Sequence, residues 1–199
     1  MKNIYNTLWI FCLAAVLVAC KNDIKDSKSM NDKEIIKTET KPLSNEAKRE
    51  LNSVFSKLMI TQELKTYVRF IISADLVEVL SNQKGPFTVF APTIDAFNNI
   101  PKEKMNLLLD YNKKIFLIDL IKTHIVEGNL DSATLVQSIN KNGGNYNLKT
   151  LSGVTLTASM IGNEIVIKDN KGVKAIIGKS DINGSNGVIH VLDTVLGVN

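Results

Sequence analysis

The amino-acid sequence predicts a single α+β domain over residues 44–199, in which N-terminal helices are followed by antiparallel β-strands. In the first part of this region apolar residues recur at helical spacing, beginning after Ser44, which is a suitable N-cap residue. Beyond Gly128 apolar and polar residues alternate, as they do in half-buried strands. Helical patterns that precede a group of strands are typical of the α+β class.

The helical part divides into short apolar segments, the first of which starts after Ser44. These segments are expected at residues 51–58, 63–72, 73–80, 93–97, 107–109 and 115–121. Gly85-Pro86 follows the third segment and breaks its pattern, and Thr93 can cap the fourth.

The predicted strands are rich in β-branched and aromatic residues or alternate with polar ones. They are expected at residues 87–90, 154–160, 165–167, 173–177 and 188–192. Pro92 is expected to stop the first strand. Tight turns at residues 161–164 and 169–172 join the middle three into an antiparallel meander. The last strand is expected to return and pair with earlier ones.

Residues 1–19 have the pattern of a lipoprotein signal peptide. Lys2 supplies a positive start, and the apolar stretch that follows is shorter than the roughly 20 residues that span a bilayer. The stretch ends at residues 17–20 in Leu-Val-Ala-Cys, which resembles the bacterial lipobox. Cys20 is therefore expected to be lipidated. Because Cys12 leaves with the signal, Cys20 would be the only thiol, which excludes an internal disulfide.

Residues 20–43 are expected to form a flexible charged stalk. Lysines and acidic residues nearly balance there and have almost no apolar partners, so the segment cannot bury enough surface to fold. Lipid chains on Cys20 would tether the domain to a membrane without inserting it.

Charge and motif content argue against several classes of function. The formal net charge is +4 for 199 residues, or 4 − 1 = +3 without Lys2, and it forms no basic block, so nucleic acid is not an expected partner. Two histidines, His124 and His190, are fewer than the three or four ligands that zinc requires. The sequence has no Gly-x-Ser-x-Gly nucleophile elbow, and Gly143-Gly144 lacks the lysine of a phosphate-binding loop. We therefore expect no metal, no cofactor and no catalysis.

Three separated stretches resemble the signature segments of the fasciclin domain family. The first is residues 85–93, Gly-Pro-Phe-Thr-Val-Phe-Ala-Pro-Thr, with Ala96-Phe97 after it. The second is Thr-His-Ile-Val-Glu-Gly at residues 123–128, and the third is Ser-Asn-Gly-Val-Ile-His-Val-Leu-Asp at residues 185–193. The resemblance implies structural roles for Thr88, Phe90, Pro92, Thr93, Phe97, His124, Asn186, Gly187, His190 and Asp193.

The resemblance also implies a role in adhesion, because the family is known for cell adhesion and for contacts with matrix and polysaccharide. In animal members an Asp-Ile pair just before the last segment takes part in integrin recognition, and Asp181-Ile182 falls at that place. These two residues are the candidate adhesion contact.

His190 and Asp193 stand three positions apart in an apolar run, which raises the question of a catalytic pair. Side chains alternate along a strand, so Val188, His190 and Leu192 are expected on one face, and Asp193 on the other if the strand continues that far. We expect His190 to be buried and hydrogen-bonded to backbone. A hydrolase that uses His124 or His190 is the enzymatic alternative.

The combined prediction is a non-catalytic binding or adhesion module, lipid-anchored in the cell envelope, that contacts an unidentified protein or glycan. Lys21 after Cys20 does not resemble the aspartate that commonly holds lipoproteins at an inner membrane, which favours the outer membrane. The sequence leaves open whether the domain lies on the cell surface or on the periplasmic side. A periplasm-facing scaffold is the alternative for the second orientation.

Overall fold

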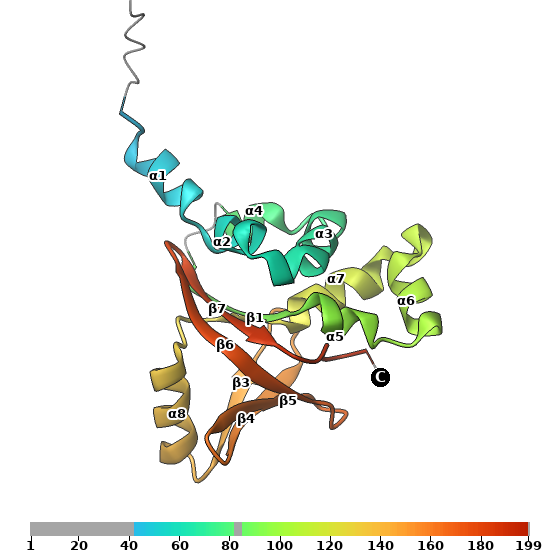
Figure 1. The fold of residues 1–199 in the computed structure, drawn as a ribbon, viewed down its shortest axis with the longest axis vertical. Coiled ribbons are helices and arrows are strands. Elements are labelled where there is room, and N and C mark those ends of the chain that lie inside the picture. Colours follow the sequence, from blue (N-terminus) through green and yellow to red (C-terminus); the bar gives the residue numbers. More distant parts are fainter. Residues whose placement is uncertain (1–41, 82–84, 199) are drawn as a thin grey trace, which may run out of the picture. The chain divides into compact units, whose positions relative to one another are not determined.

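The computed structural model describes residues 42–81 and 85–198 (Figure 1). The predicted signal peptide, the lipidation site Cys20 and nearly all of the predicted stalk lie outside the described residues.

Short helices make up most of the first half of the domain. They are α1 (Asn45–Leu51), α2 (Val54–Ile60), η1 (Gln62–Leu64), α3 (Lys65–Ser73), α4 (Val77–Ser81), α5 (Ile94–Asn98), α6 (Lys102–Leu109), η2 (Tyr111–Lys113) and α7 (Lys114–Thr123). Ser44 caps α1 as predicted, because its hydroxyl accepts a hydrogen bond from the amide of Ala47. The apolar segment at 51–58 is divided between two helices, since Ser53 caps a new helix by accepting from the amide of Ser56.

An eighth α-helix, α8 (Ser132–Lys141), lies where the sequence analysis expected only turns and strands. Asp131 caps it by accepting from the amide of Thr134, and Leu135 and Ile139 are buried one turn apart on the same face. Both signals are present in the sequence, so the expectation after Gly128 was wrong at this point.

One seven-stranded sheet crosses the domain in the order β2-β1-β7-β6-β5-β4-β3. The strands are β1 (Phe87–Pro92), β2 (Ile125–Glu127), β3 (Asn145–Lys149), β4 (Thr155–Ile161), β5 (Glu164–Lys168), β6 (Lys174–Gly184) and β7 (Gly187–Leu192). The predicted meander is present as β4, β5 and β6, and the last strand returns as predicted. It pairs antiparallel with β6 and parallel with β1, so the sheet is mixed. The α+β class is confirmed.

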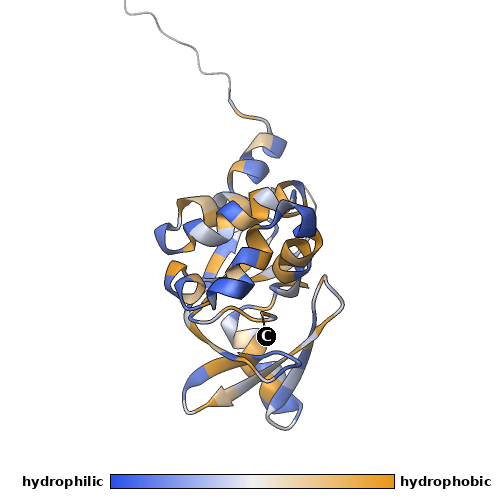
Figure 2. Ribbon diagram, turned by 90° about the vertical axis from the view of Figure 1, so that its right-hand side faces the viewer, coloured by the Kyte–Doolittle hydropathy of each residue, from blue (hydrophilic) through white to orange (hydrophobic). Residues whose placement is uncertain are grey.

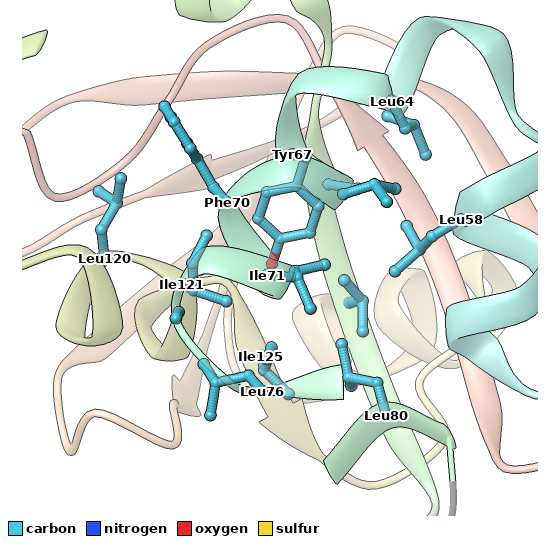
Figure 3. Packing of buried hydrophobic residues seen from close by; sticks show 14 of the residues in the cluster. Leu58, Leu64, Tyr67, Phe70, Ile71, Leu76, Leu80, Leu120, Ile121 and Ile125 are labelled. Atoms are coloured by element: carbon cyan, nitrogen blue, oxygen red, sulfur yellow. The ribbon is translucent and has the colours of Figure 1, made fainter. Parts of the chain in front are cut away.

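Two apolar cores lie on the two faces of β1 and β7. The helix-side core packs α2–α7 against the sheet around Leu58, Tyr67, Ile71 and Ile121 (Figure 3). The strand-side core packs α8 against the strands, with Leu135, Ile139, Leu148, Leu156 and Leu192 at its centre. Figure 2 shows apolar and polar residues interspersed along both the helices and the strands.

The alternation along β7 agrees with this division. Ile189 and Val191 belong to the helix-side core, whereas Leu192 belongs to the strand-side core. Because both faces are covered, all six residues of β7 are buried.

The two edge strands of the sheet approach each other, so that the sheet nearly closes on itself. Val126 of β2 forms an antiparallel bridge with Thr150, just after β3. The amide of Leu151 also donates to the carbonyl of Ile125 at 2.8 Å. Beyond this junction the edge of β3 continues past the end of β2 at Glu127.

Candidate functional site

The first and last family-like segments are about a hundred positions apart in the sequence and adjacent in the fold. They form β1 and β7, which pair in parallel from Phe87↔Gly187 to Pro92↔Leu192. Gly187 has φ +155°, and a Cβ atom there would stand 2.0 Å from the carbonyl oxygen of Phe87. A Cβ at Gly85 would stand 2.4 Å from the carbonyl oxygen of Asn186. Only glycine permits this close approach of the two backbones.

Asn186 connects this strand pair to the helices. Its side-chain oxygen accepts from the amide of Val54 at 2.8 Å, and its side-chain nitrogen donates to the carbonyl of Leu80 at 3.1 Å. Its backbone carbonyl accepts from the amide of Phe87. The buried residue Asn186 therefore joins α2 and α4, through its side-chain amide, to the start of β1 and β7.

Thr93 and Phe97 lie just after β1, where α5 begins. The Thr93 hydroxyl accepts from the amide of Ala96, which caps α5, and its own amide donates to Leu192. The Phe97 ring meets Phe70 edge-on, with ring centroids 5.1 Å apart. Pro92 is the last residue of β1, so the strand ends there as expected, two residues beyond the predicted range 87–90.

Thr88 and His190 hold the loop that leads into α8. The Thr88 hydroxyl donates to the carbonyl of Gly128 at 2.7 Å and accepts from the amide of Leu130 at 2.9 Å. Nε2 of His190 lies 2.7 Å from the carbonyl of Leu130 and donates to it. The residues that precede α8 are thus bound to two central strands, β1 and β7.

His190 is fully buried, and its ring stacks on Phe90 with centroids 5.6 Å apart. Because Nε2 carries the proton, Nδ1 is an acceptor, and it has no partner within the described part of the chain. Burial lowers the pKa of His190, although the Leu130 carbonyl and the carboxylates of Asp181 and Asp131 oppose the shift. His190 is therefore neutral near pH 7.

Asp181 anchors the first residue of α8. Its carboxylate accepts from the amide of Ser132 at 2.8 Å and also from the Ser132 hydroxyl. Burial acts to raise the pKa of Asp181, but these hydrogen bonds and nearby His190 outweigh it, so the pKa is lowered. Asp181 has φ +61°, an uncommon value for a residue other than glycine, at an irregularity in the β6–β7 pairing. Ile182 is half-buried against the helix-side core.

A groove of about 510 Å³ lies beside this anchor, between α8 and the strands. Its lining includes uncharged polar side chains and aliphatic ones, among them Ser132, Gln137, Asn140, Ser180, Ile165 and Ile177. Ser132 and Ser180 both donate to the Asp181 carboxylate, so the candidate contact residue lies at the rim of the groove. We call this the α8 groove. Its volume is within the range of ligand sites.

Both ring nitrogens of His124 form hydrogen bonds with main-chain groups. Nε2 accepts from the amide of Leu196 at 3.1 Å, so Nδ1 carries the proton and donates to the carbonyl of Leu120 at 2.9 Å. The ring is fully buried and meets Tyr67 edge-on. Burial lowers its pKa to about 4, even though the Leu120 hydrogen bond and Asp169 favour the charged form.

The two histidines do not form a site together, and His190 does not pair with Asp193. β7 ends at Leu192, so Asp193 lies beyond the strand, where its carboxylate accepts from the amide of Ile176 at 2.8 Å. Within residues 42–81 and 85–198 no group of three or more histidine, cysteine or acidic side chains is placed to hold a metal.

Sequence reasoning missed the residues that face Asp181. Asp131 and Ser132 precede an apolar pattern at Leu135 and Ile139, which is a recognisable helix start. The contact between Ser132 and Asp181 spans 49 positions, and no local pattern indicates it.

Comparisons with known proteins identify the family. The family profile described as Fasciclin domain matches residues 62–198. Protein sll1483 of Synechocystis is 36% identical over 135 residues, which are 68% of this chain and 67% of that protein. Human periostin is 33% identical over 134 residues, which are 67% of this chain but only 14% of periostin.

A solved structure of a fasciclin domain pair from the insect cell adhesion molecule Fasciclin I shares the fold, with a TM-score of 0.64 at 18% identity. The match covers 73% of this chain and 50% of that one. None of the helices in the described ranges has both the length and the apolarity to cross a bilayer. The profile match over residues 62–198 and the bacterial relative together establish that the chain belongs to the fasciclin domain family.

Proposed function

We propose that the protein is a lipid-anchored module of the cell envelope that binds a protein or glycan and mediates adhesion without catalysis. Fasciclin domain proteins typically act in cell adhesion and are typically extracellular or at the cell surface. The observation that carries the proposal for this chain is the α8 groove. Asp181, the residue at the family's adhesion position, is held at its rim by Ser132.

The chemistry of the α8 groove suits an uncharged polar ligand. Gln137 and Asn140 are exposed and supply amide donors and acceptors, whereas Ile165 and Ile177 supply apolar contact. Amides and hydroxyls of this kind can bond either to a sugar or to a peptide. In the proposal, Asp181 acts at this surface both as a contact and as the support of α8, and Ile182 places it by packing against the core.

The proposed lipid anchor would allow many weak contacts to act together and so strengthen the overall attachment. Lipidated Cys20 and the stalk at 20–43 would tether many domains to one membrane, which we propose to be the outer membrane. Tethering raises the effective concentration of binding sites, so that many weak contacts hold a cell to a surface.

Protease accessibility on intact cells tests the location. Digestion of the domain, with a periplasmic protein left intact as the control, would support exposure on the cell surface. Protection until the outer membrane is opened would contradict direct adhesion and favour the periplasm-facing scaffold. Retention in the membrane fraction should be lost in Cys20→Ser, since that change removes the lipidated thiol.

Attachment of cells tests the groove. We expect a strain in which the gene is deleted to attach poorly. When expressed in that strain, the double variant Gln137→Ala with Asn140→Ala should restore less attachment than the wild-type chain does. Lys102→Ala with Glu103→Ala, two exposed changes on α6, is the matched control and should restore attachment fully. Unchanged attachment in the deletion strain would overturn the proposed function.

The hydrolase alternative has no support in the geometry. Both histidines are fully buried, and each donates its ring proton to a backbone carbonyl, Leu120 for His124 and Leu130 for His190. A general base must come within hydrogen-bond reach of a substrate, and the burial of both rings argues against that role.

A further inference from the structure

Three asparagines in the sequence, Asn142, Asn183 and Asn186, are followed directly by glycine. Asparagine is among the thermolabile residues. In this dipeptide the main-chain nitrogen of the glycine can attack the side-chain carbonyl carbon of the asparagine, and a glycine hinders the attack least because it has no Cβ. The three sites have the same local chemistry, so the fold decides which of them can react.

Asn186 is protected on both sides of the dipeptide. It is only 8% exposed, and its side-chain amide accepts from the amide of Val54 and donates to the carbonyl of Leu80. The main chain of Gly187 lies so close to Phe87 that it leaves no room for a Cβ. Attack at this site would require the helices to leave the paired strands β1 and β7.

Asn183 has an exposed side chain, but the main chain around it is held in place. Asn183 and Gly184 are the last two residues of β6 and pair with Val188 and Gly187 of β7. A Cβ at Gly184 would stand 2.7 Å from the main-chain nitrogen of Val54, so this part of β6 also packs against α2. The Gly184 amide can turn toward the Asn183 side chain only if β6 separates from both neighbours.

Asn142 lies at the C-terminal end of α8, where the main chain is exposed. It is the C-cap of α8, and Gly143 and Gly144 after it are also exposed. The amide of Gly144 donates to Ile139 at 2.9 Å and the amide of Gly143 donates to Asn140, which together form a Schellman motif with Gly143 at φ +70°. The second bond is 3.3 Å long, beyond the usual limit of about 3.2 Å.

Opening of this cap exposes no part of either core. The side-chain nitrogen of Asn142 donates to the carbonyl of Ser138 at 2.7 Å on the exposed surface, so water can replace that bond. Among the described residues outside its chain neighbours, none has a heavy atom within 4 Å of a Cβ added at Gly143, which leaves this glycine room to turn. Helix ends fray, and local opening requires much less free energy than global unfolding.

We propose that Asn142 is a site of spontaneous deamidation in the folded protein, whereas the fold protects Asn183 and Asn186. The nitrogen of Gly143 forms a bond to Cγ of Asn142 while the Cγ–Nδ2 bond breaks. Ammonia leaves with the proton that the Gly143 nitrogen loses. Water then opens the cyclic imide at either of its carbonyls, which leaves a carboxylate on an aspartyl or an isoaspartyl residue.

The product loosens the last turn of α8. A carboxylate cannot donate to the carbonyl of Ser138, and a negative charge at the C-terminal end of a helix is unfavourable. The isoaspartyl form also adds a methylene to the main chain, which disrupts the Schellman motif. Asn140 lies in this turn and lines the α8 groove, so the modification alters one wall of that groove.

Mass spectrometry of peptides from the full chain, incubated at pH 8, tests the proposal. We expect the gain in mass that accompanies loss of an amide at Asn142, and enzymatic methylation should detect isoaspartate there. The rate should exceed that at Asn183 and at Asn186 by about tenfold or more, which corresponds to about 1.4 kcal/mol of additional opening free energy at the protected sites. In urea the three sites should react at similar rates, because only the fold distinguishes them.

Two variants provide the controls. Asn142→Gln retains an amide but cyclises much more slowly, so modification at this position should disappear. Asn145→Gln changes an exposed asparagine that is not followed by glycine, and it should leave the reaction at Asn142 unchanged. The modified chain, separated by its added negative charge, should show faster amide exchange in the last turn of α8.

Three results would each overturn the proposal. They are an unmodified Asn142 in the folded chain over the time in which the chain in urea reacts, equal rates at the three sites in the folded chain, and aspartate at position 142 without isoaspartate. The last result would indicate direct hydrolysis of the side chain without a cyclic imide. Attachment of cells is a separate readout, so failure of the proposed adhesion would leave this result unaffected.

Discussion

The helix side and the strand side of the domain differ in the cavities that their described residues line. A cavity between α3, α6 and α7 on the helix side has about 160 Å³, whereas the α8 groove and the groove along the edge of β3, both on the strand side, have about 510 and 500 Å³. A helix satisfies most of its main-chain hydrogen bonds internally, but a strand needs a neighbour on each edge. The proposed binding site, the α8 groove, accordingly lies on the strand side of the domain.

The two buried histidines show the same contrast at the level of single atoms. In the helix-side core both ring nitrogens of His124 are bonded, while on the strand side Nδ1 of His190 has no partner in the part of the chain that the structure describes. The contrast is not absolute, since the hydroxyl of Tyr67 on the helix side also has no partner there.

The largest expected effect is on the strand pair that both sides share. Gly187→Ala places a Cβ 2.0 Å from the carbonyl oxygen of Phe87, so β1 and β7 must separate. We expect a loss of about 3–5 kcal/mol in the free energy of unfolding, measured with urea. Gly178→Ala in β6 is the matched control, because nothing lies within 4 Å of its added Cβ. Equal stability of the two variants would contradict the close approach.

Acid should destabilise the domain through His124. Its pKa is about 4 in the folded state and 6.5 in the reference state, so between these values the unfolded chain binds more protons. The stabilisation is present above pH 6.5 and is lost as the pH falls toward 4, which amounts to about 3 kcal/mol. The lowered pKa of His190 acts in the same direction.

Urea unfolding at pH 7.5 and at pH 5 checks this prediction. His124→Gln should be less stable at pH 7.5 and should show a smaller loss between the two values. His190→Gln should retain most of the loss. A wild-type stability that does not change over this range would show that His124 is not buried in its neutral form.

A smaller effect is expected where the strand side anchors α8. Asp181→Asn tolerates the positive φ but removes the charge that faces the Ser132 amide, and should cost about 1 kcal/mol. Faster amide exchange in α8, with unchanged exchange in α3 and α7, would localise the effect. Ser180→Ala, which removes only a 3.2 Å contact to Asp181, is the control. Equal acceleration in α3 and α7 would contradict independent anchoring of α8.

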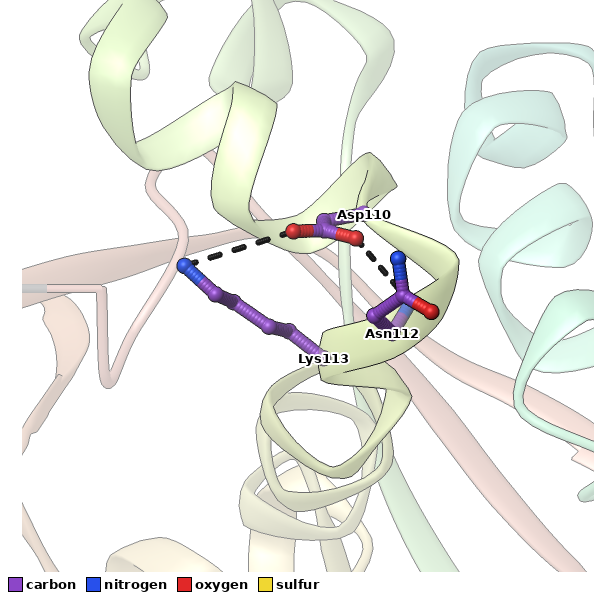
Figure 4. Close-up of polar contacts among 3 residues, drawn as sticks. All are labelled: Asp110, Asn112 and Lys113. Carbon is purple, nitrogen blue, oxygen red and sulfur yellow. Dashed lines mark hydrogen bonds and ion pairs between the residues drawn. The ribbon is translucent and has the colours of Figure 1, made fainter.

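The smallest change in stability is expected from substitutions on the helix-side surface. Lys113 and Asp110 form an ion pair at 4.0 Å, with side chains 53% and 35% exposed (Figure 4). Lys113→Ala should change stability by less than about 0.5 kcal/mol. Asp110→Ala should cost more, about 1 kcal/mol, because that carboxylate also accepts from the amide of Asn112. Thermal melts of both variants check the order, and the reverse order would contradict it.

Local patterns in the sequence were sufficient to predict much of the fold. The cap at Ser44, the hairpins β4–β5 and β5–β6 and the return of β7 follow from short-range signals, and the structure contains each of them. The segment that became α8 carried a cap and an apolar pattern as well, but the strands around it obscured both. Its omission was an error of interpretation, not a lack of signal.

The candidate site was less accessible to sequence reasoning. Resemblance indicated Asp181, but nothing local indicates that its carboxylate meets Ser132 or that a groove lies beside them. The edge of β3 was equally hidden, because a strand's sequence does not say which neighbours it has. Long-range pairing alone decides which main-chain groups stay free.

The sequence by itself determined the α+β class, most helix and strand segments, and the family, since these depend on periodicity, caps, turns and motifs within a few residues of one another. Only the tertiary structure decided that β1 and β7 pair in parallel, that the polar residues His190, Thr88 and Asp181 converge on the start of α8, and that β2 and β3 part after one bridge. The physical reason is that these contacts join residues 24 to 100 positions apart, whose proximity is set by packing of the two cores and not by local propensity.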